Sequence, residues 1–172
     1  MKTRTSILAV TAIVVVGVAW YLFRPDALVI SKTVSEPLPA EEHAMSATEQ
    51  SAMTVSEPLQ LTSGRFHKNA HDTRGRATIY RLADGRRVLR LTEFATSNGP
   101  DVRVYLVAAG DVQDEAAAKQ AGFVDLGALK GNRGDQNYDV PAGLDLSTYR
   151  AVSIWCRRFS VNFGAAPLAE TM

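Results

Sequence analysis

The sequence predicts an all-β fold of short antiparallel strands, arranged as a sandwich or a barrel, with one short helix. Two observations carry this prediction. Short segments of alternating apolar and polar residues recur from about residue 61 onward, separated by turn-forming Gly, Asn, Asp and Pro. The residues before them show no such period. The 172-residue chain therefore divides into an N-terminal segment (1–24), a linker (25–60) and one domain (61–172).

The first segment is predicted to be a membrane anchor. A predominantly apolar run covers residues 7–23, near the lower limit of the roughly 17 to 25 residues that cross a bilayer. A cleaved signal peptide needs small residues after its apolar core, whereas residues 20–25 are mostly bulky, which favours an uncleaved signal anchor. Lys2 and Arg4 place the N-terminus in the cytoplasm, so the domain is expected outside it, in a periplasmic or extracellular location.

The linker, residues 25–60, is rich in Ser, Thr, Glu, Pro and Ala and is predicted to be flexible. It contains a duplication, because Thr-Val-Ser-Glu-Pro-Leu occurs at 33–38 and again at 54–59. The prolines oppose regular strand pairing, which favours a solvated spacer that grew by duplication. The alternative is that the repeated hexapeptide is a docking motif.

The domain begins with a predicted hairpin. Residues 78–82 and 87–91 alternate, and the turn between them contains Gly85, which tolerates a positive φ. A further strand is expected at 102–106, after the turn-forming residues 97–101.

The helix is predicted to start at a cap provided by Asp111, to run through 114–119 and to stop at Gly122. Strands are then expected around 123–126 and 137–140. The last strand is expected over 152–161. Its apolar residues change from even to odd positions at Arg157 and Arg158, which indicates a β-bulge there.

The last strand contains Cys156, the only cysteine of the chain. Val152, Ile154 and Cys156 share one face, so the thiol is expected to point into the core, with Trp155 on the opposite face for packing. Because the chain offers no second cysteine, Cys156 is an apolar filler, a reactive thiol or a ligand to an external group. The two neighbouring arginines would stabilise a thiolate if they turned towards it.

An ordered set of residues resembles a known family. The residues that carry the resemblance are Gly64-x-Phe66, His71-x-x-x-Gly75-x-Ala77-x-Ile79-Tyr80, Leu89-Arg90-Leu91, Phe94, Asn98-Gly99-Pro100-Asp101-x-x-Val104-Tyr105-Leu106, Leu126-Gly127-x-Leu129-Lys130-Gly131-Asn132, Gln136-Asn137-Tyr138 and Val152-x-Ile154-Trp155-Cys156. Together they are similar to the DM-thirteen domain, an electron-transfer domain related to the DOMON β-sandwiches. With the predicted anchor, the resemblance indicates a membrane-anchored protein of bacterial type.

The resemblance implies a β-sandwich with a redox role centred on Cys156, either as a bare thiol or as the ligand of a prosthetic group such as haem. His71 lies inside the family-like pattern and is the second candidate ligand. The implied partners are a redox protein or a small thiol. The alternative is a binding or adhesion module that uses the loops at 98–101 and 131–134, with Cys156 structural. Either role suits an electron-transfer or binding domain better than a stand-alone enzyme.

Other chemistries are not supported by the sequence. No histidine follows Cys156, so the usual blue-copper arrangement is missing, and a single cysteine cannot form the Cys-x-x-Cys of c-type haem attachment or of a dithiol oxidoreductase. No metal site is predicted. A net charge of +1 without a basic stripe gives no indication of nucleic-acid binding.

Overall fold

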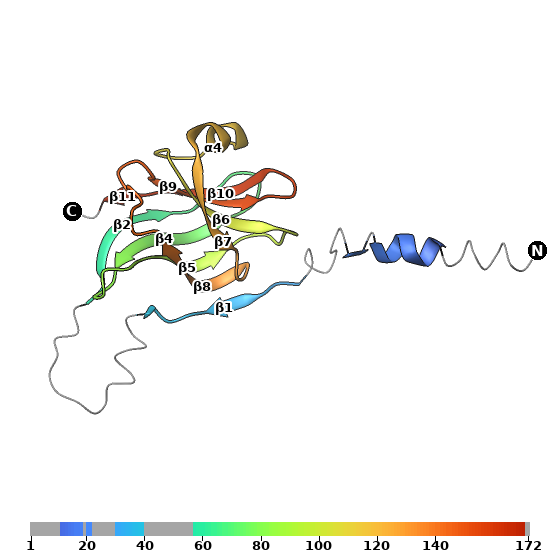
Figure 1. Ribbon diagram of the computed structural model, residues 1–172, viewed down its shortest axis with the longest axis horizontal. Coiled ribbons are helices and arrows are strands. Elements are labelled where there is room, and N and C mark those ends of the chain that lie inside the picture. Colours follow the sequence, from blue (N-terminus) through green and yellow to red (C-terminus); the bar gives the residue numbers. More distant parts are fainter. Residues whose placement is uncertain (1–10, 19, 22–29, 40–56, 171–172) are drawn as a thin grey trace, which may run out of the picture.

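The computed structural model describes residues 11–18, 20–21, 30–39 and 57–170. Two sheets pack face to face as a β-sandwich, which confirms the all-β prediction (Figure 1). The elements are β1 (Thr33–Ser35), β2 (Leu59–Arg65), β3 (His67–Lys68), β4 (Arg74–Arg81), β5 (Arg87–Ala95), β6 (Val102–Val107), α4 (Glu115–Ala121), β7 (Phe123–Ala128), β8 (Arg133–Val140), β9 (Ala151–Cys156), β10 (Val161–Pro167) and β11 (Ala169–Glu170).

The sheets have different strand orders. One contains six strands in the order β1-β8-β5-β4-β2-β11, and the other contains five in the order β3-β10-β9-β6-β7. The predicted hairpin is confirmed as β4 and β5, with Gly85 at a φ of +85° in the turn. All strand pairs described are antiparallel except β1 with β8, which is parallel.

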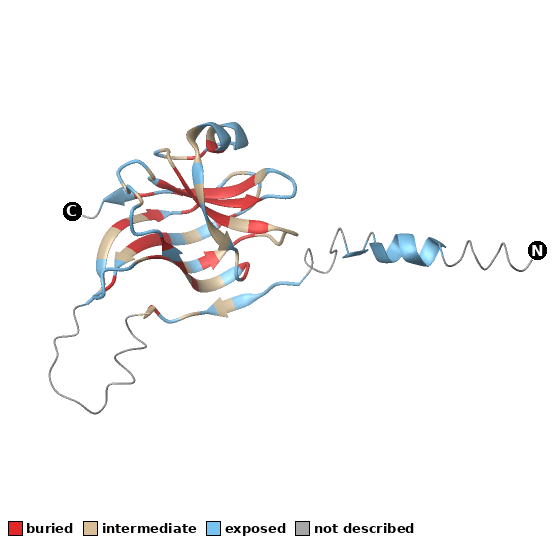
Figure 2. Cartoon of the chain, in the orientation of Figure 1, coloured by how far each residue is buried: buried red, intermediate tan, exposed pale blue. Residues whose placement is uncertain are grey.

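The main hydrophobic core lies between the two sheets (Figure 2). It is built from the alternate inward-facing residues of the central strands, such as Ile79, Leu89, Leu106 and Ile154, all fully buried. Burying such apolar side chains supplies most of the driving force for folding, about 1.5 to 3 kcal/mol for each large one.

A second cluster lies on the outer face of the five-stranded sheet, beneath α4. Tyr105, Trp155 and Ala165 of the sheet pack there against Val112 and Ala118. Strand β9 is therefore covered on both faces, and all six of its residues are buried. Cys156 belongs to the core between the sheets and Trp155 to the outer cluster, as their predicted opposite orientations require.

The helix begins later than the sequence suggests. Its cap is Asp114, whose carboxylate accepts a hydrogen bond from the Ala117 amide, and not Asp111. Asp111 instead accepts a hydrogen bond from the Val112 amide and pairs with His67. Gly122 ends the helix with a φ of +81°, as expected.

The predicted long strand over 152–161 is two strands. Strand β9 ends at Cys156, residues 157–160 form an exposed turn, and β10 begins at Val161. The change of parity at Arg157 and Arg158 therefore marks a hairpin turn and not the predicted bulge. Ser160 takes a left-handed φ of +54° to complete it. A register shift does occur in β10, between Asn162 and Gly164.

The structure also differs from the expectation of a linker over residues 25–60. The first copy of the repeated hexapeptide is ordered on the domain: Thr33–Ser35 form β1 against β8, and Leu38 is buried. Residues 40–56 lie outside the described part, and so does the first half of the second copy, residues 54–56.

The N-terminal segment is described only at residues 11–18 and 20–21, which are helical and exposed. Within the described residues, no helix has the length and apolar character needed to span a membrane. The rest of the predicted anchor, at 1–10, 19 and 22–24, lies outside the described residues.

The double-sided burial of β9 leads to a first prediction. Trp155→Ala removes an indole that is 5% exposed and should lower the free energy of unfolding by about 3 to 5 kcal/mol. Cys156→Ser places a hydroxyl in the apolar core and should cost about 1 to 3 kcal/mol. Denaturant unfolding of both variants measures these losses. An unchanged transition midpoint for both would show that β9 is not central to the core.

Candidate functional site

Cys156 is the last residue of β9 and is fully buried. Its register partners are Val102 on β6 and Val161 on β10, and its side chain belongs to the core cluster that includes Phe66 and Phe163. The thiol therefore faces the interior, as its sequence parity predicts. Solvent does not reach it in this conformation.

The neighbouring arginines do not serve the thiol. Arg157 and Arg158 are exposed, in the turn that follows β9. The Arg157 backbone amide donates to the Asp101 carbonyl oxygen at 2.9 Å, and its Nε donates to the Asp101 carboxylate at 2.8 Å. Arg157 thus fixes the hairpin end to the 98–101 loop. Among the described contacts, neither arginine makes one with Cys156 that would stabilise a thiolate, as the sequence suggested.

Trp155 lies on the other face of β9, where its role is packing. Its ring stacks on Tyr105 with centroids 6.2 Å apart, and Tyr105 stacks on Phe123 at 4.3 Å. The Lys119 ammonium group of α4 lies 5.9 Å from the Trp155 ring, within the range of a cation–π contact. The Lys119 contact and the burial of Ala118 hold α4 onto the outer face of the sheet.

His71 packs on an aromatic side chain of β10. Its ring lies against that of Phe163, with centroids 3.9 Å apart, and its backbone amide donates to the Phe163 carbonyl oxygen. A second histidine, His67, contacts the Asp111 carboxylate through Nε2 at 2.9 Å. Neither of these interactions brings a histidine ring to Cys156.

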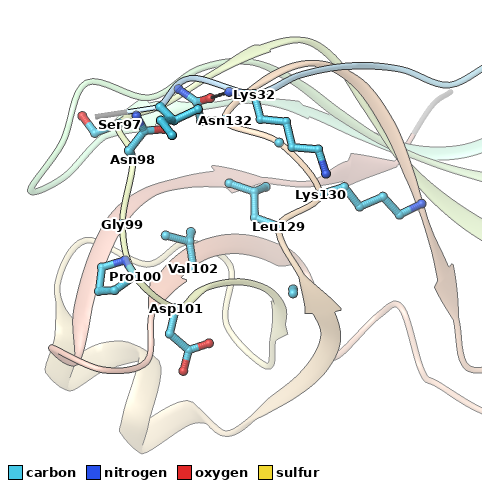
Figure 3. Close-up of a pocket in the computed structure, with 13 residues that line it drawn as sticks. Lys32, Ser97, Asn98, Gly99, Pro100, Asp101, Val102, Leu129, Lys130 and Asn132 are labelled. Atoms are coloured by element: carbon cyan, nitrogen blue, oxygen red, sulfur yellow. Dashed lines mark hydrogen bonds between the residues drawn. The ribbon is translucent and has the colours of Figure 1, made fainter. Parts of the chain in front are cut away.

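A surface cleft of about 490 Å³ lies between two loops at one end of the sandwich (Figure 3). One wall is the loop 97–101 before β6, and the other is the loop 128–132 between β7 and β8, with Ile30 and Lys32 beside it. Val102 and Leu129 provide apolar lining, while Ser97, Asn98 and Asn132 provide polar groups. The alternative hypothesis of a binding module names two loops, 98–101 and 131–134, and parts of both line this cleft.

The 128–132 loop is shaped by two buried amide side chains. Gln136 is fully buried, accepts hydrogen bonds from the Lys130 and Gly131 amides, and donates to the Gly131 carbonyl oxygen at 2.9 Å. Asn132 donates to the Thr96 carbonyl oxygen and accepts from the Lys32 amide. Sequence reasoning missed both roles, although both residues lie within the family-like pattern.

The cleft does not fit a haem. An axial ligand is His, Cys, Met or Tyr, and none of these lines the cleft. Cys156 lies within the packed core, and His71 packs on Phe163. No group of three or more His, Cys, Asp or Glu side chains that could hold a metal ion occurs among the residues the structure describes.

Comparison with known proteins decides the family. The family model described as "Electron transfer DM13" matches residues 65–168. The chain belongs to this family. No curated protein and no solved structure gave a match. The family match supports an electron-transfer-related role for the DM13 domain, whose sandwich occupies nearly the span expected from the sequence.

The His67–Asp111 pair of the DM13 domain leads to a second prediction. Partial burial lowers the pKa of His67, but the Asp111 carboxylate and the Lys68 carbonyl oxygen outweigh it, so the pKa is raised above its ordinary 6.5. The pair therefore stabilises the fold fully below about pH 6.5, and this contribution is lost as the pH rises through the folded-state pKa. Both side chains are about a third exposed, so the contribution should be at most about 1 kcal/mol.

Urea unfolding at about pH 5.5, 7 and 8.5, values that span the ordinary histidine pKa, tests the predicted pH dependence of the His67–Asp111 contribution. Wild type should be more stable than His67→Gln at the lowest pH, and the difference should shrink at the highest. The matched control is the same comparison in an Asp111→Asn background, which lacks the carboxylate partner of His67. There the stability difference caused by His67→Gln should no longer depend on pH. A difference independent of pH would contradict the assignment.

Proposed function

We propose that this DM13 domain carries electrons by thiol–disulfide exchange at Cys156, outside the cytoplasm and tethered to a membrane. The observation that carries the proposal is the position of Cys156 in an electron-transfer domain: it ends β9 immediately before the exposed turn 157–160. The exchange partner is a disulfide of another protein or of a small thiol.

The closed conformation buries the thiol, so exchange requires local opening. The end of the β9–β10 hairpin is the segment suited to this, because four exposed residues connect the strands there. The pairs of Cys156 with Val161 and Val102 are the last of their ladders on that side. Fraying of strand ends costs far less free energy than global unfolding, and it would release the thiol while leaving the sandwich folded.

The chemistry balances without a second cysteine in the chain. The Cys156 thiolate attacks one sulfur of the partner disulfide, a new S–S bond forms, and the other sulfur leaves as a thiolate. One thiol of a reduced dithiol then attacks the partner sulfur of the mixed disulfide and restores the Cys156 thiolate, and the second thiol of that dithiol displaces the remaining partner sulfur as a thiolate. The dithiol becomes a disulfide, so two electrons have passed from it to the original disulfide. A bare thiol is favoured over a haem ligand, because the surroundings of Cys156 and His71 do not fit a haem.

The membrane location rests on the sequence. Residues 7–23 form an apolar run of anchor length, and the described part of it is helical with exposed Ile13, Val14 and Val16 side chains. Such a row of exposed aliphatic side chains is unfavourable in water and suits a lipid environment.

A second candidate function is ligand binding in the cleft between the 97–101 and 128–132 loops. A concave site with apolar lining and a few polar groups at its edge is typical of small-molecule recognition. In that case Cys156 is structural.

A third prediction separates these functions by alkylation of the native full-length chain. If exchange occurs through hairpin opening, Arg157→Ala should raise the native labelling rate of Cys156 about two- to fivefold, because it removes the contact with Asp101. Arg158→Ala is the matched control, since it changes a neighbouring exposed charge of the same turn. Labelling that follows only global unfolding in every variant would make Cys156 structural and favour the cleft.

A fourth prediction concerns topology. The mature chain should retain Met1 to Phe23 and expose residue 61 onward outside the cytoplasm. Protease added to cells with a permeabilised outer layer should remove the domain, and mass spectrometry of the mature N-terminus should find Met1. Full protection would contradict the orientation, and an N-terminus beyond Phe23 would contradict the anchor.

A further inference from the structure

The first copy of the repeated hexapeptide is bound along the edge of β8 (Figure 1). We refer to residues 32–38 as the docked segment. Thr33, Val34 and Ser35 pair in parallel with Arg133, Gly134 and Asp135. The segment therefore adds a strand to an existing sheet, which is a recurring mode of peptide recognition.

The backbone of the docked segment is bound along its length. At its start, the Lys32 amide donates to the Asn132 side chain at 2.7 Å, and its carbonyl oxygen accepts from the Arg133 amide. At the other end, the Glu36 amide donates to the Asp135 carbonyl oxygen and its carbonyl oxygen accepts from Arg90. These bonds fix the register without regard to the side chains of the segment.

The last residues of the segment are recognised through their chemistry. Both Glu36 carboxylate oxygens lie 2.8 Å from the Lys130 ammonium nitrogen, and one accepts from the Asn137 amide. The Asn137 side chain donates to the Pro37 carbonyl oxygen at 2.7 Å, and Leu38 is buried. Partial burial raises the pKa of Glu36, but Lys130, Asn137 and Arg90 outweigh it, so the net pKa is lowered and the carboxylate is ionised.

Two glycines allow the close approach. A Cβ at Gly131 would lie 2.5 Å from the Lys32 carbonyl oxygen, and a Cβ at Gly134 would lie 2.0 Å from that of Val34. At Gly131 the three nearest atoms all belong to the docked segment. This makes Gly131 a position where a methyl group would obstruct the segment selectively.

The sequence Thr-Val-Ser-Glu-Pro-Leu recurs at residues 54–59, so every side chain that the β8 edge contacts from 33 to 38 has an identical counterpart. We propose that the β8 edge is a peptide site specific for this hexapeptide, and that its second ligand is the 54–59 copy of another molecule of this chain. Exchange of the two copies would link one chain to the next.

Sheet order explains why the second ligand comes from another chain. Leu59 starts β2 and pairs with Arg81, and β2 lies three strands from β8 in the order β8-β5-β4-β2, or about 14 Å away. Within one chain, bringing Leu59 across that distance to β8 would detach about four residues of β2, since an extended residue spans about 3.3 Å. A neighbouring chain needs to release only its Leu59–Arg81 pair.

The test uses the full chain with residues 31–38 deleted, which leaves the β8 edge free. A fluorescein-labelled octapeptide with the sequence of residues 53–60 is titrated and its anisotropy measured. Binding should saturate, and it should weaken at least tenfold with Gly131→Ala in the protein or with Gln at the glutamate position of the peptide. Gly143→Ala is the matched control, because no atom lies within 4 Å of the position that a Cβ would take there. No binding, or binding insensitive to Gly131→Ala, overturns the proposal.

Two further measurements complete the test. Sedimentation of the deleted chain should show concentration-dependent association that Gly131→Ala abolishes, and a monomer at all concentrations would overturn linkage between chains. The second measurement uses the undeleted chain, so it does not require the deletion variant to fold. Excess unlabelled octapeptide should accelerate amide hydrogen exchange at residues 33–38. Unchanged exchange there would overturn competition for the site.

Discussion

The buried amide of Gln136 is the interaction on which the functional end of the domain depends. It accepts from the Lys130 and Gly131 amides and from the Tyr138 hydroxyl, and it donates to the Gly131 carbonyl oxygen. Without it the buried amide and carbonyl of Gly131 would lose these partners, each at a cost of about 1 to 3 kcal/mol. The side chain thus gives the 128–132 loop one shape. That loop forms a wall of the cleft and, through Lys130 and Asn132, holds the docked segment.

Cys156 depends on a different constraint, the burial of β9 on both faces. The core between the sheets encloses the thiol, and α4 covers Trp155 on the opposite face. Displacing the middle of the strand would therefore expose two clusters at once. Access to the thiol must come from the hairpin end, where Arg157 joins the turn to Asp101. Since Asp101 also lines the cleft, occupancy of the cleft and opening of the hairpin share one residue.

The sequence predicted well what depends on local pattern and poorly what depends on distant partners. The β4–β5 hairpin, β6 and the inward orientation of Cys156 follow from alternation and turn residues. Asp111 and Asp114 are equally good helix caps locally, and the choice is made by His67, 44 positions away from Asp111. Strand β1 was missed because prolines closely follow a short segment whose partner strand lies far along the chain. The parity change after Cys156 was detected, but a turn and a bulge produce the same change.

The docked segment also connects the proposed exchange of the two hexapeptide copies with the cleft. Ile30 and Lys32, which line the cleft, precede the first hexapeptide, and the residues in the same places before the second copy are Ser51 and Met53. Replacing one copy by the other would keep the contacts of the glutamate with Lys130 while removing a cation and an aliphatic side chain from the cleft wall. The β8 edge contacts the repeated residues, so its affinity for the segment should not change. The affinity of the cleft for a ligand should change, because the cleft wall differs. The duplication would then give one domain two versions of its cleft, selected by which chain supplies the edge strand.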